Sequence, residues 1–325
     1  MIVVDKVYGK QKVDNGLIIE LLGSPELKRL DGVGQYGTWK MLDKKFDTTR
    51  LEHSFGVYVL LKRFGADLNE QVAGLLHDVN HTAFSHVVDY VLGDPETQEF
   101  GDAKHKDIIL SSSIPAILKN HNVDVHKVSD HHSFGLLDKD LPDLCCDRLD
   151  YCLRDALCCG FIDQKGVSEI LDDLYVYEGE IICNNKAAAH RLASLFLKMS
   201  KFLWSNGVQA GSYLLLADAL KIAVKENIIS VDDFYSTDDV LFNKLKDSGN
   251  EKILELLGNI RKDAIVPGTK DDHDIFSKSK ARFIDPKFIN NCSVKKLSDV
   301  DPMFKKEVED FKAWIAPGFY IKVRK

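Results

Sequence analysis

The stretch His77-Asp78-Val79-Asn80-His81-Thr82-Ala83-Phe84-Ser85-His86 determines how this chain of 325 residues is interpreted. It follows the apolar run Val72-Ala73-Gly74-Leu75-Leu76, so a His-Asp pair stands at the edge of a hydrophobic segment. Burying an ionisable pair costs free energy unless a metal ion or a charged partner compensates. The stretch therefore predicts a polar site at the end of a buried helix.

Two other segments carry side chains of the same chemistry. Arg50-Leu51-Glu52-His53 precedes the central stretch, and Cys146-Asp147-Arg148-Leu149-Asp150-Tyr151 follows it. Adjacent residues on a helix point about 100° apart, so His77 and Asp78 can reach one ion only where the helix ends. A set of two imidazoles and two carboxylates suits one divalent ion, which we expect to be Mn, Fe, Co, Ni, Zn or Mg. The predicted ligands are His53, His77, Asp78 and Asp147.

Each of these histidines, taken alone, is better explained by a local hydrogen bond. Only their combination with the carboxylates favours a metal site.

The composition is that of a soluble globular protein, with 45% apolar and 29% charged residues. A net charge of −7 argues against a nucleic-acid partner. No apolar run approaches the roughly 18 residues of a membrane span, and the cysteines lack CxxC spacing, so we expect a cytoplasmic protein without membrane association.

The periodicity of apolar residues predicts a mainly α fold. Two long helices are expected after a β-hairpin at 175–183, and strand-like runs at 281–286 and 318–323 flank a charged helix near 302–314. We therefore expect a helical core over 20–165 and, over 166–325, a helical extension that ends in a small α+β subdomain packed on the core. The expected helices are 53–64, 71–79, 84–92, 105–120, 142–159, 186–204 and 209–227.

These motifs resemble those of the HD-domain phosphohydrolases. The likeness rests on Arg50–Ser54, His77–His86 and Asp147–Asp155, and it extends in order and spacing from Arg29 to Asp155 and more loosely beyond. Within the family, the chain most resembles the deoxynucleoside triphosphate triphosphohydrolases. The resemblance implies a helical HD-domain core and the same four metal ligands.

The resemblance also implies catalytic roles near the metal. His81 and His86 are expected to face the scissile phosphate. Asp89 follows His86 by one turn, where it could orient that ring or accept a proton, or be a solvated helix residue. His105 matches a catalytic histidine that the triphosphohydrolases follow with a glutamate, but Lys106 stands there in this chain, which puts a general-acid role of His105 in doubt.

A further set of residues matches positions that hold the substrate. Gln35 and Tyr36 match a segment that touches the nucleoside sugar. Sugar or phosphate contacts are implied for Arg50, Arg148, Tyr151 and Asp155. From the residues alone, Arg148 has the alternative of a surface ion pair.

The triphosphohydrolases place a cluster of basic residues and a histidine on the helix that matches 186–204. This chain keeps only Lys198 and Lys201 near its end. Fewer cations weaken the preference for a triphosphate, so a mono- or diphosphate substrate also becomes credible.

We therefore expect a metal-dependent phosphohydrolase that acts on a nucleotide or a similar small phosphate ester. One alternative is a regulatory protein that binds a nucleotide with weak turnover. Another is a two-metal phosphodiesterase, in which His131-His132 would bind the second ion, although the polar sequence around this pair favours an exposed turn. A homo-oligomer is implied by the resemblance alone.

Overall fold

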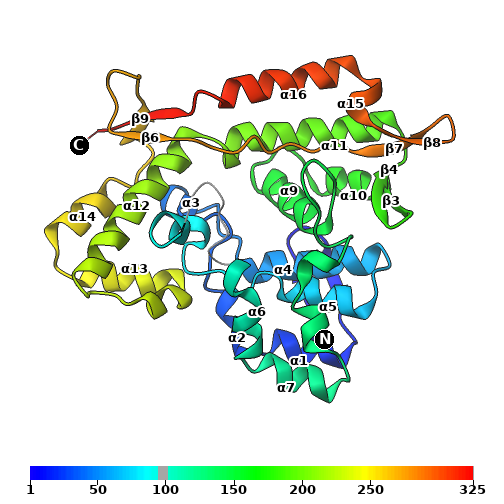
Figure 1. The fold of residues 1–325 in the computed structure, drawn as a ribbon, viewed down its shortest axis with the longest axis horizontal. Coiled ribbons are helices and arrows are strands. Elements are labelled where there is room, and N and C mark those ends of the chain that lie inside the picture. Colours follow the sequence, from blue (N-terminus) through cyan, green and yellow to red (C-terminus); the bar gives the residue numbers. More distant parts are fainter. Residues whose placement is uncertain (94–101, 325) are drawn as a thin grey trace.

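A group of four helices forms the centre of the molecule. The computed structural model describes residues 1–93 and 102–324, and in it α4 (Arg50–Arg63) packs against both α5 (Leu68–Leu76) and α9 (Cys146–Cys158). The helix α11 (Lys186–Met199) covers α9 (Figure 1). Their apolar faces form the larger of two hydrophobic clusters.

The second cluster is built around α12 (Gly207–Lys225) at the other end of the molecule (Figure 1). Against it pack α13 (Asp238–Asp247), α14 (Glu251–Gly258) and a three-stranded sheet. The order of this sheet is β5-β9-β6, with all neighbours antiparallel. Its strands are β5 (Ile265–Pro267), β6 (Ile275–Ser277) and β9 (Phe319–Val323).

The mainly α prediction is correct only in part, because the described residues form nine strands in three sheets. The expected hairpin is present, with Glu178 and Gly179 at φ of 50° and 78° in its turn. Its strand β4 also pairs in parallel with β7, which extends the hairpin to four strands. The remaining strands are β1 (Ile2–Asp5), β2 (Gly9–Lys12), β3 (Leu174–Tyr177), β4 (Glu180–Cys183), β7 (Lys287–Asn290) and β8 (Ser293–Lys296).

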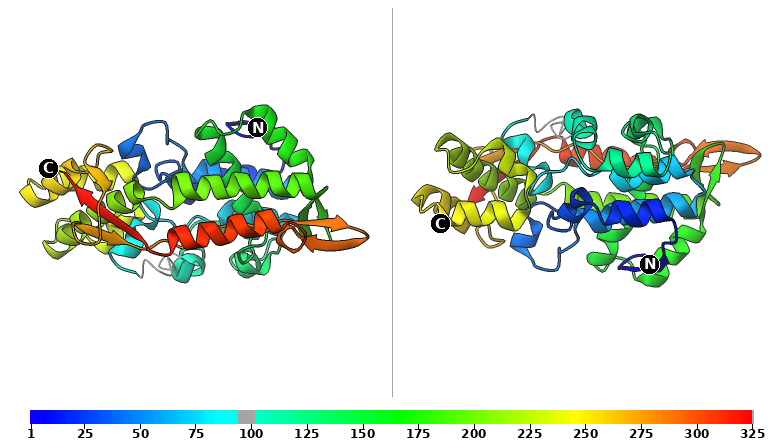
Figure 2. Two further views of the ribbon diagram at one scale, coloured as in Figure 1. Left: turned by 90° about the horizontal axis from the view of Figure 1, so that it is seen from above. Right: turned by 90° about the horizontal axis from the view of Figure 1, so that it is seen from below.

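The run 281–286 is not a strand, and this expectation was wrong. It belongs to an extended segment between β6 and β7, where the Arg282 carbonyl accepts a hydrogen bond from the Ser200 hydroxyl instead of from a neighbouring strand. In contrast, the strand expected at 318–323 is β9, and the charged helix is α16 (Pro302–Ile315), which runs beside α11 (Figure 2).

Several predicted helices are shorter than expected. The segment 84–92 contains only a 3₁₀ turn, Ser85–Tyr90. Phe84 and Ser85, at its start, have φ of 60° and 53°, which lie outside the range of a right-handed α-helix. The helix predicted over 186–204 ends at Met199 and continues as a π turn to Trp204. The segment 105–120 divides into α6 (Asp102–Leu110) and α7 (Ile114–Asn120).

The other helices are short. They are α1 (Gly16–Leu22), α2 (Pro25–Leu30), α3 (Trp39–Leu42), α8 (Val125–Val128), α10 (Gln164–Asp172) and α15 (Leu297–Val300). Within residues 1–93 and 102–324, no helix combines the length and the apolar character needed to cross a bilayer.

Candidate metal centre and pocket

The helix α5 ends at Leu76, three residues before the end predicted at 79. The His-Asp pair therefore lies in the turn that follows, at the end of a buried helix as the sequence predicted. His77 is the C-cap residue, and the turn continues with hydrogen bonds from Val79 N to Leu76 O and from His81 N to Asp78 O. Because the helix has opened, the side chains of His77 and Asp78 reach the same point, with His77 Nε2 3.4 Å from Asp78 Oδ1.

His53 and Asp147 come to this point from α4 and α9. His53 Nε2 lies 2.9 Å from Asp147 Oδ1, 3.3 Å from His77 Nε2 and 3.9 Å from Asp78 Oδ2. The structure thus brings all four predicted ligands together, and donor atoms of His53, His77 and Asp147 lie within 4.8 Å of one another.

Hydrogen bonds to the far side of each ring present both Nε2 atoms to this point. His77 Nδ1 donates to the Gly74 carbonyl at 2.7 Å, and His53 Nδ1 donates to Asp150 Oδ2 at 2.7 Å. These partners hold the proton on Nδ1, so Nε2 is the ring atom that a metal would bind, displacing any proton that Nε2 carries. Two Nε2 atoms and two carboxylates in this orientation fit one divalent ion.

A buried network supports Asp150. Arg154 donates from Nε and Nη2 to the two oxygens of Asp150, both at 2.9 Å, and it also reaches Asp5 Oδ2 at 3.1 Å. The Tyr8 hydroxyl donates to Asp150 Oδ1 at 2.8 Å. Asp5 ends β1 and Tyr8 lies in the turn that leads to β2, so the N-terminal hairpin contributes to the site, which sequence analysis did not predict.

The charges of the centre act strongly on each other. Burial opposes a proton on His53, but hydrogen bonds to Asp147 and Asp150 prevail and raise its pKa to about 10. Burial opposes the charge of Asp147 too, but His53 and His77 hold the pKa of this carboxyl well below its usual range. Concentrated negative charge of this kind favours a bound cation.

Arg50 was expected to touch substrate, and it lines the pocket described below, but its guanidinium is already engaged. Nη1 donates to Asp78 Oδ2 at 2.9 Å, and Nε donates to Ser85 Oγ at 2.9 Å. Ser85 Oγ in turn donates to the Gly34 carbonyl. Arg50 therefore orients Asp78 and ties α4 to the left-handed turn at Phe84 and Ser85.

His81 and His86 face each other beside the metal centre, with ring centroids 5.0 Å apart. His81 Nε2 lies 3.2 Å from Asp78 Oδ1, and burial with the nearby Arg50 charge lowers the pKa of His81 to about 3, so this ring is neutral at pH 7. Asp89 is buried with Oδ2 3.4 Å from His86 Nδ1, which agrees with an orienting role rather than a solvated one.

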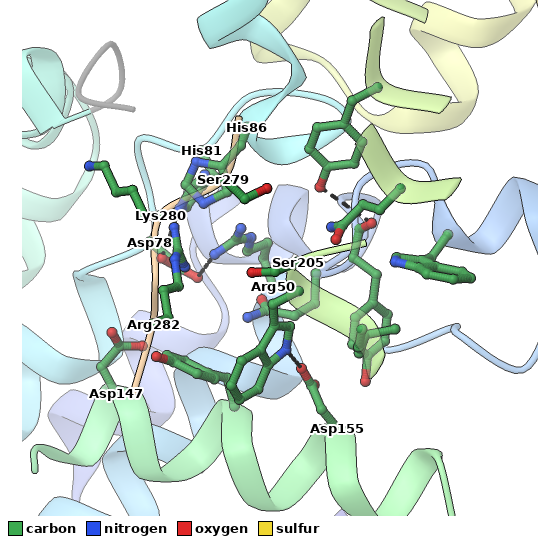
Figure 3. Close-up of a pocket in the computed structure, with 18 of the residues that line it drawn as sticks. Arg50, Asp78, His81, His86, Asp147, Asp155, Ser205, Ser279, Lys280 and Arg282 are labelled. Carbon is green, nitrogen blue, oxygen red and sulfur yellow. Dashed lines mark hydrogen bonds and ion pairs between the residues drawn. The ribbon is translucent and has the colours of Figure 1, made fainter. Parts of the chain in front are cut away.

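A pocket of about 660 Å³ opens from the metal centre towards the second apolar cluster (Figure 3). Of the predicted residues, the following line it: Gln35, Tyr36, Arg50, His77, Asp78, His81, His86, Asp147, Tyr151 and Asp155. Burial raises the pKa of Asp155 to about 7, and the Trp204 indole nitrogen donates to its Oδ2 at 2.6 Å.

Four of the predicted residues do not line the pocket: His53, Asp89, His105 and Arg148. Arg148 donates to the carbonyls of Asp143 and Lys139 and so holds the loop before α9, rather than a surface ion pair. His105 is buried, with Nε2 3.1 Å from the Leu76 carbonyl and Nδ1 3.2 Å from the Ser129 carbonyl. Its ring packs on His131, with centroids 4.5 Å apart.

The pair His131-His132 lies in a short 3₁₀ turn, His131–Ser133, where His132 is 62% exposed, so the exposed turn that the sequence favoured is present, although it also borders the pocket. Both rings line the pocket, and His132 Nδ1 lies 2.8 Å from Asp138 Oδ2. His131, His132 and Asp138 form a second group whose donor atoms lie within 4.8 Å of one another.

Sequence analysis missed a large part of the pocket wall. The aromatic residues Trp39, Tyr90, Trp204 and Tyr213 line it, together with Gln209 from α12. Lys278, Ser279, Lys280 and Arg282 come from the extended segment before β7. The alternation of cations in Lys278-Ser279-Lys280-Ala281-Arg282 was visible in the sequence and is the signal that could have identified this wall.

The comparisons with known proteins agree with this geometry. Residues 50–155 match the family model described as the HD domain. The chain is 36% identical to the uncharacterized protein YdhJ of Bacillus subtilis over the full length of both chains. It is 32% identical to the metal-dependent phosphohydrolase cns2 of Cordyceps militaris over 66% of this chain and 63% of that protein. Its fold matches that of a phosphohydrolase from Bacteroides thetaiotaomicron with a TM-score of 0.75 and 15% identity, over the whole of both chains.

Proposed function

Because the chain belongs to the HD-domain phosphohydrolases, we propose that it uses one divalent metal ion to hydrolyse a phosphate ester or anhydride bond of a nucleotide. The observation that carries this proposal is the convergence of His53, His77, Asp78 and Asp147, of which the last three line the pocket. The name of the Cordyceps relative, a metal-dependent phosphohydrolase, supports the reaction class.

The bound metal ion and the two histidines beside it would each supply one part of the hydrolysis. A bound divalent ion would supply Lewis-acid activation of water and of a phosphoryl oxygen. His81 is neutral at pH 7 and can accept a proton or a hydrogen bond next to the metal ligands. His86, oriented by Asp89, is the second group that can move a proton at the scissile phosphate.

The far end of the pocket suits a nucleoside. Its volume lies within the roughly 300–1,000 Å³ of small-molecule sites. Gln35 Oε1 and Trp39 Nε1 are buried polar atoms on its wall, and neither has a hydrogen-bond partner within residues 1–93 and 102–324. Buried groups of this kind are normally satisfied, so hydroxyl or base groups of a nucleoside would complete them. Tyr36, Tyr151 and Asp155 would contact the sugar.

The experiment is a hydrolysis panel with a matched ligand variant. Purified protein is loaded with Mn, Co, Ni, Mg or Zn and incubated with nucleoside mono-, di- and triphosphates, and the phosphate product is identified. We expect turnover that depends on metal and is lost in Asp147→Asn but kept in Asp172→Asn, an exposed carboxylate of α10. Bound metal and tight nucleotide binding without any product would instead support a regulatory protein.

The group of His131, His132 and Asp138 favours a second candidate, a two-metal phosphodiesterase. In that case two ions per chain would be found by elemental analysis, and His131→Ala would abolish hydrolysis of a cyclic or linear phosphodiester. One ion per chain and no phosphodiester turnover would exclude it.

A further inference from the structure

The basic strap, defined as residues 278–282, crosses the mouth of the pocket in front of Asp78 (Figure 3). Lys278, Lys280 and Arg282 all line the pocket, and Arg50 is the other Lys or Arg among the described lining residues. The strap therefore contributes three of the four Lys and Arg side chains among the described residues that line the pocket. The overall charge of −7 makes this local concentration of cations more distinctive.

The cations that sequence analysis considered for this purpose lie elsewhere. Lys198 Nζ lies 3.7 Å from the centroid of the Phe161 ring, and Lys201 Nζ lies 5.8 Å from that of Phe311. Neither lysine lines the pocket. The helix that carries the basic cluster in the related triphosphohydrolases therefore does not present these two cations to a substrate here.

The backbone of the strap is fixed on both sides. Upstream, Ser277 pairs with Phe319 in the β6-β9 ladder. Downstream, Ser200 Oγ donates to the Arg282 carbonyl at 2.6 Å, and Asp285 N donates to the Pro142 carbonyl at 2.9 Å. A fixed backbone reduces the entropy lost when its side chains bind an anion.

We propose that the basic strap binds the phosphates beyond the scissile one, so that the substrate is a nucleoside di- or triphosphate rather than a monophosphate. This inference rests on the proposed function. From residue 278 to residue 282 an extended chain covers about 13 Å, at ~3.3 Å per residue. Cations distributed over this length match a chain of phosphates better than a single phosphate. Arg282 would contribute paired N–H donors, and the lysines would act as point charges.

The test compares one nucleoside with one, two and three phosphates. Arg282→Ala and Lys280→Ala are expected to raise KM for the triphosphate by about tenfold or more, the usual effect of losing a charge-assisted hydrogen bond. KM for the monophosphate should change by less than about threefold. Arg282→Lys should restore part of the loss. The matched controls are Lys198→Ala and Lys201→Ala, which lie off the pocket and should leave all three KM values unchanged.

Circular dichroism and metal content, measured on every variant, separate a loss of binding from a loss of fold. Equal losses for mono- and triphosphate, or none for either, would overturn the role of the strap. If the wild type hydrolyses only monophosphates, the proposed function stands and this inference is wrong. If the wild type hydrolyses no nucleotide, the proposed function fails. Titration with a non-hydrolysable triphosphate analogue then tests the strap by itself, and affinity that is unchanged in Arg282→Ala would overturn it.

Discussion

His53 shows how a single side chain is prepared for a metal before any metal binds. One nitrogen is held by Asp150, and the other lies 2.9 Å from Asp147, so the ring has only one productive orientation. The sequence identified His53 because its chemistry and its order along the chain are local information. It could not identify Tyr8 or Asp5, since their contacts with Asp150 and Arg154 exist only after residues more than 140 positions apart have come together.

Removing the charge of Asp150 should therefore weaken metal binding, although Asp150 is not itself one of the proposed metal ligands. We expect Asp150→Asn to reduce metal affinity by about 10- to 100-fold, the usual effect of losing such a supporting carboxylate. Tyr8→Phe removes one hydrogen bond, about 1 kcal/mol, and should reduce it by only about fivefold. Titration against a competing chelator measures both. Tyr177→Phe, on the exposed hairpin, is the control, and unchanged affinity in Asp150→Asn would contradict the role of this network.

Asp238 links the start of α13 to the turn that carries His86. Its oxygens accept hydrogen bonds from Phe84 N at 2.7 Å and from Gly34 N at 2.9 Å. Burial nevertheless dominates and raises the pKa of Asp238 to about 6. A folded-state pKa above the unfolded value near 3.8 means that the folded protein gains stability from this group when it is protonated.

This contribution should disappear as the pH rises from about 4 to about 6. We expect the unfolding free energy of the wild type, relative to Asp238→Asn, to fall by on the order of 2 to 3 kcal/mol between pH 4 and pH 7. Urea unfolding of the metal-free proteins at both pH values measures the difference. Asp239→Asn, its exposed neighbour, should show no such trend. A relative stability that is constant, or that rises with pH, would show that the two N–H donors outweigh burial.

At the scale of elements, the position of the His-Asp turn depends on how closely α5 approaches α4. A Cβ atom on Gly74 would lie 2.2 Å from Leu61 Cδ1 and 3.3 Å from Val57 Cγ1, both on α4. Gly74 also provides the carbonyl that orients His77. Sequence periodicity placed α4 and α5 to within three residues at each end, but it could not reveal that this glycine sets the distance between them.

Gly74→Ala should consequently damage both stability and metal binding. Overpacking should lower the unfolding free energy by about 1–3 kcal/mol, which offsets or exceeds the gain of up to about 1 kcal/mol from the higher helix propensity of alanine. We expect an unchanged or lower melting temperature and a loss of metal affinity of several-fold, measured by thermal unfolding and by chelator competition. Gly258→Ala in α14 is the matched control, because nothing lies within 4 Å of its added Cβ, and it should be neutral or slightly stabilising. A more stable Gly74→Ala with full metal affinity would refute this account.

The pattern of residues along the sequence predicted the strands of the C-terminal region less well than it predicted the helices of the core. The run at 281–286 has the composition of a strand, but β9 already pairs with β5 on one side and with β6 on the other. The segment after β6 leaves the sheet, and its cations turn to the pocket. Whether a segment can join a sheet depends on which strand edges are still unpaired. That follows from the strand order of the whole sheet and cannot be read from a short stretch of sequence.

At the scale of the whole molecule, the pocket lies at the seam between the two apolar clusters. The metal ligands lie on, or directly after, helices of the first cluster, whereas Ala210 and Tyr213 of the second cluster also line the pocket. The strap joins the two, because it leaves the sheet of the second cluster and is anchored to Ser200 at the end of α11. Metal binding therefore depends on the first cluster, whereas substrate binding depends on both, through Tyr36 and Tyr151 on the first and Tyr213 on the second.

Ile321 tests this separation. It is 1% exposed at the centre of β9 and packs on α12, where a Cβ at Gly211 would lie 3.2 Å from Ile321 Cγ2. Ile321→Ala should lower the unfolding free energy by about 2–5 kcal/mol. Because β9 holds β6 and β6 leads into the strap, KM for a nucleoside triphosphate should rise several-fold, while metal affinity stays within about threefold.

Ile289→Ala in β7 is the control. That side chain is 38% exposed, so its truncation should lower the unfolding free energy by less than about 1 kcal/mol. Denaturant unfolding, chelator competition and steady-state kinetics on the same preparations give the three quantities. A variant that loses metal affinity and substrate affinity to the same extent would show that the two clusters act as one.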